Sequence, residues 1–171
     1  MKYAGIISDD IVNGKGVCIS FWVQFCPHRC PGCHNPQTWS IDGGYELPVD
    51  YIQRIERLLT KNGIKRNLSV LGGEPLCLEN IAMVYDLLLY VKNDLPDTKI
   101  FVWTGGEYET LLAQFPGIFK YIDVLIDGEF DITHRDITLP LRGSPNQRVI
   151  DVQKSLKLGQ TITIPDEKLR G

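Results

Sequence analysis

The chain has 171 residues, of which 43% are hydrophobic and 23% are charged, a composition typical of a globular domain rather than a disordered chain. Its formal net charge of −3 argues against a nucleic-acid binder, which normally carries a basic surface. We therefore expect one domain over residues 1–171 and no nucleic-acid partner.

The sequence contains no visible targeting or membrane-spanning segment. Residues 1–10 lack the basic start and apolar run of a signal peptide. The longest apolar stretches, such as residues 118–126, are short and interrupted by charges, so no membrane partner is expected. We expect a cytoplasmic protein, and in that compartment five cysteines indicate metal or redox chemistry rather than disulfides.

The first expected strand covers residues 17–25, which are rich in β-branched and aromatic side chains. The loop that follows this strand contains three of the five cysteines, at Cys26, Cys30 and Cys33. Residues 49–59 place apolar side chains at helical spacing and are followed by an Asn-Gly pair that favours a helix stop. The sequence thus predicts a strand, a cysteine-rich loop and a helix.

The middle of the chain repeats the strand–helix order. Residues 68–71 predict a short strand that runs into the turn Gly72-Gly73-Glu74-Pro75, and residues 81–91 predict a helix with one apolar face. Residues 99–103 predict a further strand, which enters Thr104-Gly105. Glycine-rich turns therefore follow these strands.

The last part of the chain continues the pattern less clearly. Residues 108–115 predict a short helix, and residues 122–126 predict a strand that ends at Asp127-Gly128. Two further strands are expected at residues 148–152 and 161–164.

Alternating strands and helices predict a single α/β domain with a parallel sheet, either open or curled into an incomplete barrel. In such sheets, ligands bind beyond the carboxyl ends of the strands. The cysteine loop, the Gly-Gly-Glu-Pro turn, Thr104 and Asp127 all follow predicted strands. We therefore expect them to share one rim of the sheet.

The three clustered cysteines have the spacing Cys-x3-Cys-x2-Cys. Three thiolates on a short loop can each bind a different iron of a cubane cluster and leave the fourth iron open to a substrate. Two alternatives remain: a structural zinc site completed by His28, His34 or Cys77, and an electron-carrier cluster with Cys77 as its fourth ligand. The isolated Cys18 and Cys77 are otherwise expected to be buried and chemically idle.

A loop of this spacing after a strand, with a Gly-Gly-Glu-Pro turn two elements later, resembles the radical S-adenosylmethionine enzymes. The resemblance is closest to the small activating proteins of anaerobic ribonucleoside-triphosphate reductase. The matching strings occur in order along most of the chain, which makes the set far more specific than any one of them. They are residues 10–16 (DIVNGKG), 30–35 (CPGCHN), 71–76 (LGGEPL), 102–105 (VWTG), 123–128 (DVLIDG) and 142–147 (RGSPNQ).

This resemblance implies an incomplete, partial TIM-type radical-SAM barrel in which Cys26, Cys30 and Cys33 hold a [4Fe–4S] cluster. The amino and carboxylate groups of S-adenosylmethionine would chelate the fourth iron. A low-potential electron donor would then drive cleavage to methionine and a 5′-deoxyadenosyl radical, which takes a hydrogen atom from a glycine of the reductase. The implied partners are the anaerobic ribonucleoside-triphosphate reductase as protein substrate and that donor.

The resemblance also implies roles for residues outside the cysteine loop. Gly72, Gly73, Glu74 and Pro75 would contact S-adenosylmethionine, with the Glu74 carboxylate meeting its amino group. Related proteins often have a basic residue where this chain has Glu129, so Arg142 is expected to bind the methionine carboxylate instead. The remaining residues expected near the cofactors or the mouth of the site are His34, Asn35, Thr104, Asp127 and the Asn13-Gly14 pair.

Two other functions remain open at this point. In the first, the radical chemistry acts on another glycyl-radical enzyme or on a small molecule, as in deazapurine synthesis. Alternatively, the chain is a zinc-stabilised interaction module and not an enzyme. The short chain favours a protein substrate, because a small domain leaves one side of the sheet open to a loop of another protein.

Overall fold

The computed structural model describes residues 1–170. It contains one sheet of seven strands in the order β3-β1-β2-β4-β5-β6-β7. The central strands β2 (Cys18–Val23), β4 (Asn67–Gly72), β5 (Ile100–Trp103) and β6 (Val124–Asp127) are parallel. The α/β class with parallel strand–helix units is therefore confirmed, and the sheet is consistent with a partial barrel.

The edges of the sheet are antiparallel. β1 (Lys2–Asp10) pairs with β2 and with the short β3 (Tyr45–Glu46). At the other edge, β7 (Arg148–Asp151) runs antiparallel to β6. The sheet is thus mixed, whereas the sequence predicted a parallel sheet; the antiparallel pairs are confined to its edges.

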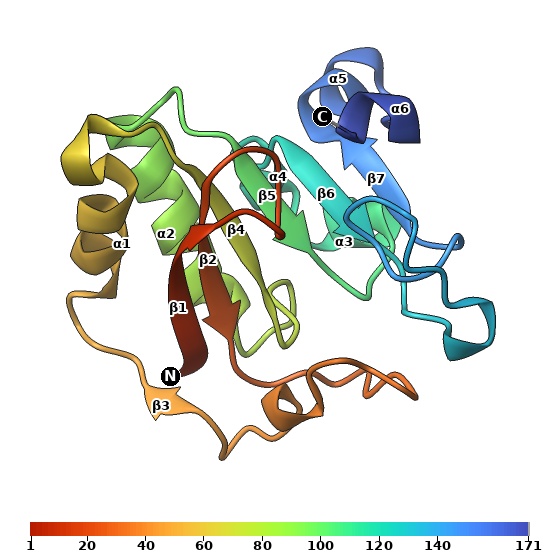
Figure 1. Ribbon diagram of the computed structural model, residues 1–171, viewed down its shortest axis with the longest axis horizontal. Helices are drawn as coiled ribbons and strands as arrows, with labels where there is room; N and C mark the ends of the chain where they lie inside the picture. Colours follow the sequence, from red (N-terminus) through yellow and green to blue (C-terminus); the bar gives the residue numbers. More distant parts are fainter. Residues whose placement is uncertain (171) are drawn as a thin grey trace.

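The helices connect the strands. They are α1 (Tyr51–Thr60), α2 (Ile81–Asp94), α3 (Tyr108–Gln114), α4 (Pro116–Phe119), α5 (Val152–Leu158) and α6 (Asp166–Leu169), with 3-10 turns η1 (Pro36–Thr38), η2 (Lys61–Gly63) and η3 (Ile132–His134). In Figure 1, α1 lies at the left of the sheet and α2 lies partly behind the central strands, and the loop between β1 and β2 crosses in front of these strands. None of the helices in the described residues is long and apolar enough to span a membrane.

The side-chain alternation along the strands separates the two faces of the sheet. Ile19, Phe21 and Val23 of β2 belong to the buried core, together with apolar residues of α1 and α2. The intervening Trp22 faces the opposite side, where it lines a pocket. Strand β5 repeats the pattern, with Val102 in the core and Trp103 at the pocket. One face therefore holds the core and the other is available for a site.

Most predicted elements are confirmed within a few residues, and the tail differs. The strand expected at residues 148–152 is β7 (Arg148–Asp151), and Val152 already begins α5. The strand expected at residues 161–164 is wrong: Thr163 makes only an isolated bridge to Ile150. The assignment of one domain to residues 1–171 stays a prediction, and residue 171 lies outside the described part.

Candidate functional site

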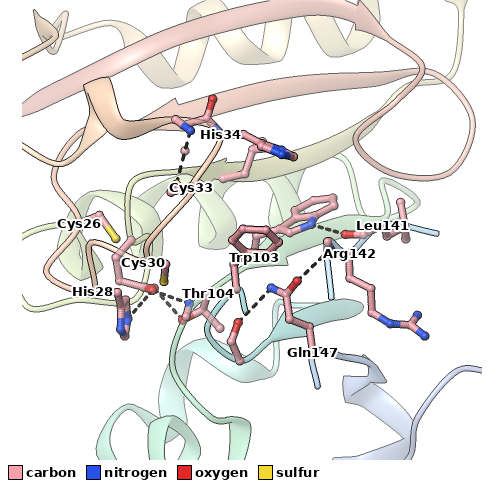
Figure 2. Close-up of a pocket in the computed structure, with 18 of the residues that line it drawn as sticks. Cys26, His28, Cys30, Cys33, His34, Trp103, Thr104, Leu141, Arg142 and Gln147 are labelled. Atoms are coloured by element: carbon pink, nitrogen blue, oxygen red, sulfur yellow. Dashed lines mark hydrogen bonds and ion pairs between the residues drawn. The ribbon is translucent and has the colours of Figure 1, made fainter. Parts of the chain in front are cut away.

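A pocket with a volume of about 470 Å³ lies at the carboxyl ends of the central strands. Figure 2 shows this pocket, with Cys26 and Cys30 near His28 and Thr104. Pro75 and Asp127 were expected at this rim but are not lining residues. The structure brings together the other predicted site residues: Cys26, Cys30, Cys33, His34, Asn35, Gly72, Gly73, Glu74, Thr104 and Arg142.

The cysteine loop is tightly folded. Its backbone takes left-handed values at Phe25, Arg29 and Gly32, and the Cys33 amide donates to the Cys30 carbonyl at 3.1 Å. Gly32 is required here because a Cβ atom would lie 2.7 Å from the side chain of Ile132. These turns leave Cys26, Cys30 and Cys33 as partly exposed free thiols on one wall of the pocket.

The three thiols line the pocket but do not converge on a single position. Within residues 1–170, no three His, Cys, Asp or Glu side chains converge to hold a single metal ion. A cubane cluster has a different requirement, because each thiolate binds a different iron. Burial raises the pKa of the Cys26 and Cys30 thiols, so both are protonated at neutral pH until a metal replaces the proton.

The Gly-Gly-Glu-Pro turn packs directly on the start of the cysteine loop. The Gly73 amide donates to the Val23 carbonyl at 2.9 Å, and the Glu74 amide donates to the Phe25 carbonyl at 2.7 Å. A Cβ atom on Gly73 would lie only 2.2 Å from the Phe25 carbonyl oxygen. Glycine at this position therefore allows the turn and the loop to share a backbone contact.

Glu74 is buried, and its carboxylate is bound by the protein itself. Oε1 accepts from the Leu76 amide at 2.9 Å and from the Thr104 hydroxyl at 2.7 Å. Oε2 accepts from the Gly105 amide at 2.7 Å and contacts Nε2 of His28 at 3.0 Å. Four protein groups thus occupy the carboxylate that was expected to meet the amino group of a ligand. Its observed role is to join the turn to the end of β5.

His28 is a site residue that the sequence did not identify, because its position suggested only a zinc ligand. Its ring bridges two carboxylates, with Nε2 3.0 Å from Glu74 and Nδ1 2.8 Å from Glu129. The hydrogen bond to Glu74, supported by the one to Glu129, raises the pKa of His28 to about 9. The position of His28 inside the cysteine loop was the one feature of the sequence that could have marked it. Its partners, Glu74 and Glu129, are distant in the chain, so the sequence did not indicate the ion pairs.

Thr104 and Asp127 have structural partners. The Thr104 hydroxyl donates to Glu74 and accepts from the Gly106 amide at 3.1 Å, at the edge of the pocket. Asp127 is buried outside the pocket, where it accepts from the Tyr108 amide at 2.8 Å and pairs with Arg148. Asp127 therefore anchors the start of α3 instead of facing the site.

Arg142 lines the pocket, but its guanidinium is committed to another carboxylate. It binds Asp166 through two hydrogen bonds of 2.7 and 3.1 Å. In Figure 2 the guanidinium extends away from Cys26 and Cys30. Arg135, which also lines the pocket, is exposed and makes no ion pair within residues 1–170. Arg135 was not singled out in the sequence, since nothing in its local pattern marks it.

The remaining predicted residues lie around the mouth and floor. The Asn35 amide points to the Cys33 sulfur at 3.4 Å, and the His34 ring packs against Phe130 with a centroid distance of 5.8 Å. Asn13 lines the pocket, and its loop is held by Asp10, whose carboxylate accepts from the Asn13 side chain at 2.7 Å. These contacts hold polar side chains of two loops, residues 33–35 and residues 10–13, at the pocket.

Comparisons with known proteins give one matching family model and several similar proteins. A family model described as a 4Fe-4S single cluster domain matches residues 12–150. The anaerobic ribonucleoside-triphosphate reductase-activating protein of Vibrio cholerae is 37% identical over 148 residues, which cover 86% of this chain and 96% of that protein. The protein of the same name from Pasteurella multocida is 38% identical over 150 residues, which cover 86% of this chain and 95% of that protein. The one from Escherichia coli K12 is 35% identical over 150 residues, which cover 87% of this chain and 97% of that protein.

Proposed function

The chain belongs to the family of anaerobic ribonucleoside-triphosphate reductase-activating proteins, and on this premise we propose that it activates such a reductase by generating a radical on one of its glycines. The observation that carries the proposal is the shared pocket. Three free thiols with Cys-x3-Cys-x2-Cys spacing line a cavity of about 470 Å³ together with Gly72, Gly73 and Glu74 of the Gly-Gly-Glu-Pro turn.

The thiols fit a [4Fe–4S] cluster. Cys26, Cys30 and Cys33 provide three soft ligands on one wall, and a three-ligand set leaves one iron free for a cosubstrate. Cys18 is buried in the sheet, and the Cys77 thiol contacts the Glu74 carbonyl, so neither lines this pocket. When bound, the cluster supplies the electron that cleaves S-adenosylmethionine to methionine and a 5′-deoxyadenosyl radical.

The protein places the cosubstrate. Gly72 and Gly73 line the pocket beside the cysteine loop, and the contacts of Glu74 fix the shape of that turn. Trp22 and Trp103 offer an apolar floor suited to a purine ring. We assign the methionine carboxylate to Arg135, because its guanidinium is unpaired within residues 1–170 whereas that of Arg142 already holds Asp166.

The protein substrate and the electron source complete the proposal. The pocket is open to the surface, and the 11–17 and 131–143 loops contribute to its lining, so a glycine-containing loop of the reductase would meet these loops as it enters. A separate low-potential donor delivers the electron. Action in the cytoplasm is supported by five free cysteines, which persist in a reducing compartment.

The proposal is tested by reconstituting the protein with iron and sulfide without oxygen and adding S-adenosylmethionine and a strong reductant. We expect about four irons per chain and formation of 5′-deoxyadenosine and methionine in equal amounts. Stoichiometric zinc without iron, or an iron-loaded protein that leaves S-adenosylmethionine intact, would contradict it.

A further inference from the structure

His28 lies inside the cysteine loop without being a thiol ligand, and its contacts point toward the neighbouring turn. We propose that His28 is a positioning residue that locks the cysteine loop to the Gly-Gly-Glu-Pro turn, and thereby fixes the place of S-adenosylmethionine relative to the cluster. This inference rests on the proposed function, because it concerns how two parts of that same site are held together.

The link between the two segments is a chain of direct contacts. Nε2 of His28 is 3.0 Å from Oε2 of Glu74, whose side chain is only 4% exposed. The same carboxylate holds the Thr104 hydroxyl and the Gly105 amide, both at 2.7 Å. His28 therefore connects the loop to the turn and, through Glu74, to the end of β5.

Packing and a second carboxylate hold the ring in this orientation. A Cβ atom on Gly105 would lie 2.7 Å from Cδ2 of His28, so the ring lies directly on the β5 backbone. On the other side, Nδ1 is 2.8 Å from Glu129, which follows β6. The ring thus contacts segments that follow β4, β5 and β6, and it cannot rotate without losing both hydrogen bonds.

The backbone alone does not provide the same connection. The turn is bonded to the loop at its start, through the Phe25 carbonyl. Beyond that point, His28 is the side chain of residues 26–33 that hydrogen bonds to the turn in the described structure. Three thiolates could hold a cluster without His28, but the position of the cysteine loop relative to the turn beside which the cosubstrate would bind depends on this link.

The main test compares His28→Ala with the wild-type protein after anaerobic reconstitution. We expect iron content to stay at about four per chain, while S-adenosylmethionine binds about tenfold more weakly, the order of effect of losing a charged hydrogen bond. We also expect a smaller S-adenosylmethionine-induced change in the electron paramagnetic resonance spectrum of the reduced cluster. A change in stability alone would not alter that spectrum.

Two further variants separate positioning from folding. In His28→Gln, an amide nitrogen can still donate to Glu74, so most of the affinity should return. His134→Ala is the matched control, since that histidine is 69% exposed and pairs with Asp131 within its own turn; it should behave as wild type.

A double-mutant cycle that combines His28→Ala with Glu74→Gln tests directly whether His28 acts through Glu74. If His28 acts through Glu74, its removal has little further effect on affinity once Glu74 has been changed. The inference is overturned if His28→Ala binds S-adenosylmethionine as wild type does, if the two effects add, or if both His28 variants lose their iron. A wild-type protein without a cluster, or with a spectrum that S-adenosylmethionine leaves unchanged, would instead overturn the proposed function.

Discussion

At the scale of single residues, the site consists of free thiols held by a network of polar contacts. Cys26, Cys30 and Cys33 line the pocket without a partner thiol, whereas the Glu74 carboxylate is fully occupied by protein donors. The cysteines are therefore the groups available to bind iron. Glu74 is better suited to holding the surrounding backbone in place than to contacting a ligand.

Cys30→Ala should remove the cluster, because two thiolates cannot replace three on this loop. We expect iron to fall from about four per chain to near zero, and cleavage of S-adenosylmethionine to stop. Cys77→Ser is the control, since its thiol contacts the Glu74 carbonyl instead of the pocket. Iron and acid-labile sulfide measurements check both variants; a full iron complement in Cys30→Ala would show that the ligands are assigned wrongly.

Arg135→Gln and Arg142→Gln distinguish the two pocket-lining arginines. Loss of Arg135 should weaken S-adenosylmethionine binding by about tenfold, the order expected for a charged contact to a carboxylate. Loss of Arg142 should change affinity much less, because its guanidinium is bound to Asp166. Equilibrium binding to reconstituted protein measures both. If Arg142→Gln weakens S-adenosylmethionine binding more than Arg135→Gln does, Arg142 binds the methionine carboxylate and our assignment is wrong.

At the scale of elements, the decisive feature is the contact between the turn after β4 and the loop after β2. The neighbouring parallel strands bring these segments together, and the Gly73 amide and Glu74 amide then bond to the end of β2 and the loop. The cysteine motif and the glycine turn are about forty residues apart in the chain, so only the sheet makes them one site.

Gly73→Ala tests this contact. The new Cβ would approach the Phe25 carbonyl oxygen to 2.2 Å, which requires the turn and the loop to separate. We expect a loss of about 1–3 kcal/mol in the free energy of unfolding, together with weaker S-adenosylmethionine binding. Gly5→Ala in β1 is the control, because nothing lies within 4 Å of its added Cβ. Urea unfolding compares them, and equal stability of the two variants would argue against the contact.

The sequence predicted the central elements because their patterns are local. A run rich in β-branched and aromatic side chains marked β2, and apolar residues at helical spacing marked α1 and α2. The tail was predicted less well. Residues 161–164 carry β-branched side chains, but they bond mainly through Ile162 and Ile164 to β7 and form no strand.

The site, like the fold, was predictable where its residues form a local pattern. Cys26, Cys30 and Cys33 form a short motif and were found from spacing alone. The partners of His28, Arg142 and Asp127 are distant in the chain, and no local pattern indicates them. Their roles depend on which loops meet at the rim, which only the folded structure provides.

At the scale of the whole molecule, the segment after β7 folds back on the domain. Glu109 of α3 accepts from Arg148 and from the Thr161 hydroxyl, and Asp166 holds Arg142. The C-terminal segment thus braces the outer end of the sheet and the 131–143 loop beside the pocket.

Low pH should weaken the contacts of Glu109 with Arg148 and Thr161. The hydrogen bonds from Arg148, with a further one from Thr161, lower the pKa of Glu109 from 4.5 to about 2. A carboxylate with a lowered pKa adds stability above pH 4.5, and that contribution is lost as the pH falls toward 2. Glu109→Gln should therefore lose less stability than wild type between about pH 6 and about pH 3. Urea midpoints of iron-free protein measure this, with the exposed Glu107→Gln as control; parallel losses in wild type and Glu109→Gln would refute it.

The central claim is that this chain transfers radical chemistry from its pocket to a glycine of an anaerobic ribonucleoside-triphosphate reductase. The most direct measurement is electron paramagnetic resonance of the reductase after anaerobic incubation with reconstituted protein, S-adenosylmethionine and a strong reductant. We expect a glycyl radical signal on the reductase, and no such signal when Cys30→Ala replaces the wild-type protein. An iron-loaded protein that cleaves S-adenosylmethionine but leaves the reductase without a radical would contradict it.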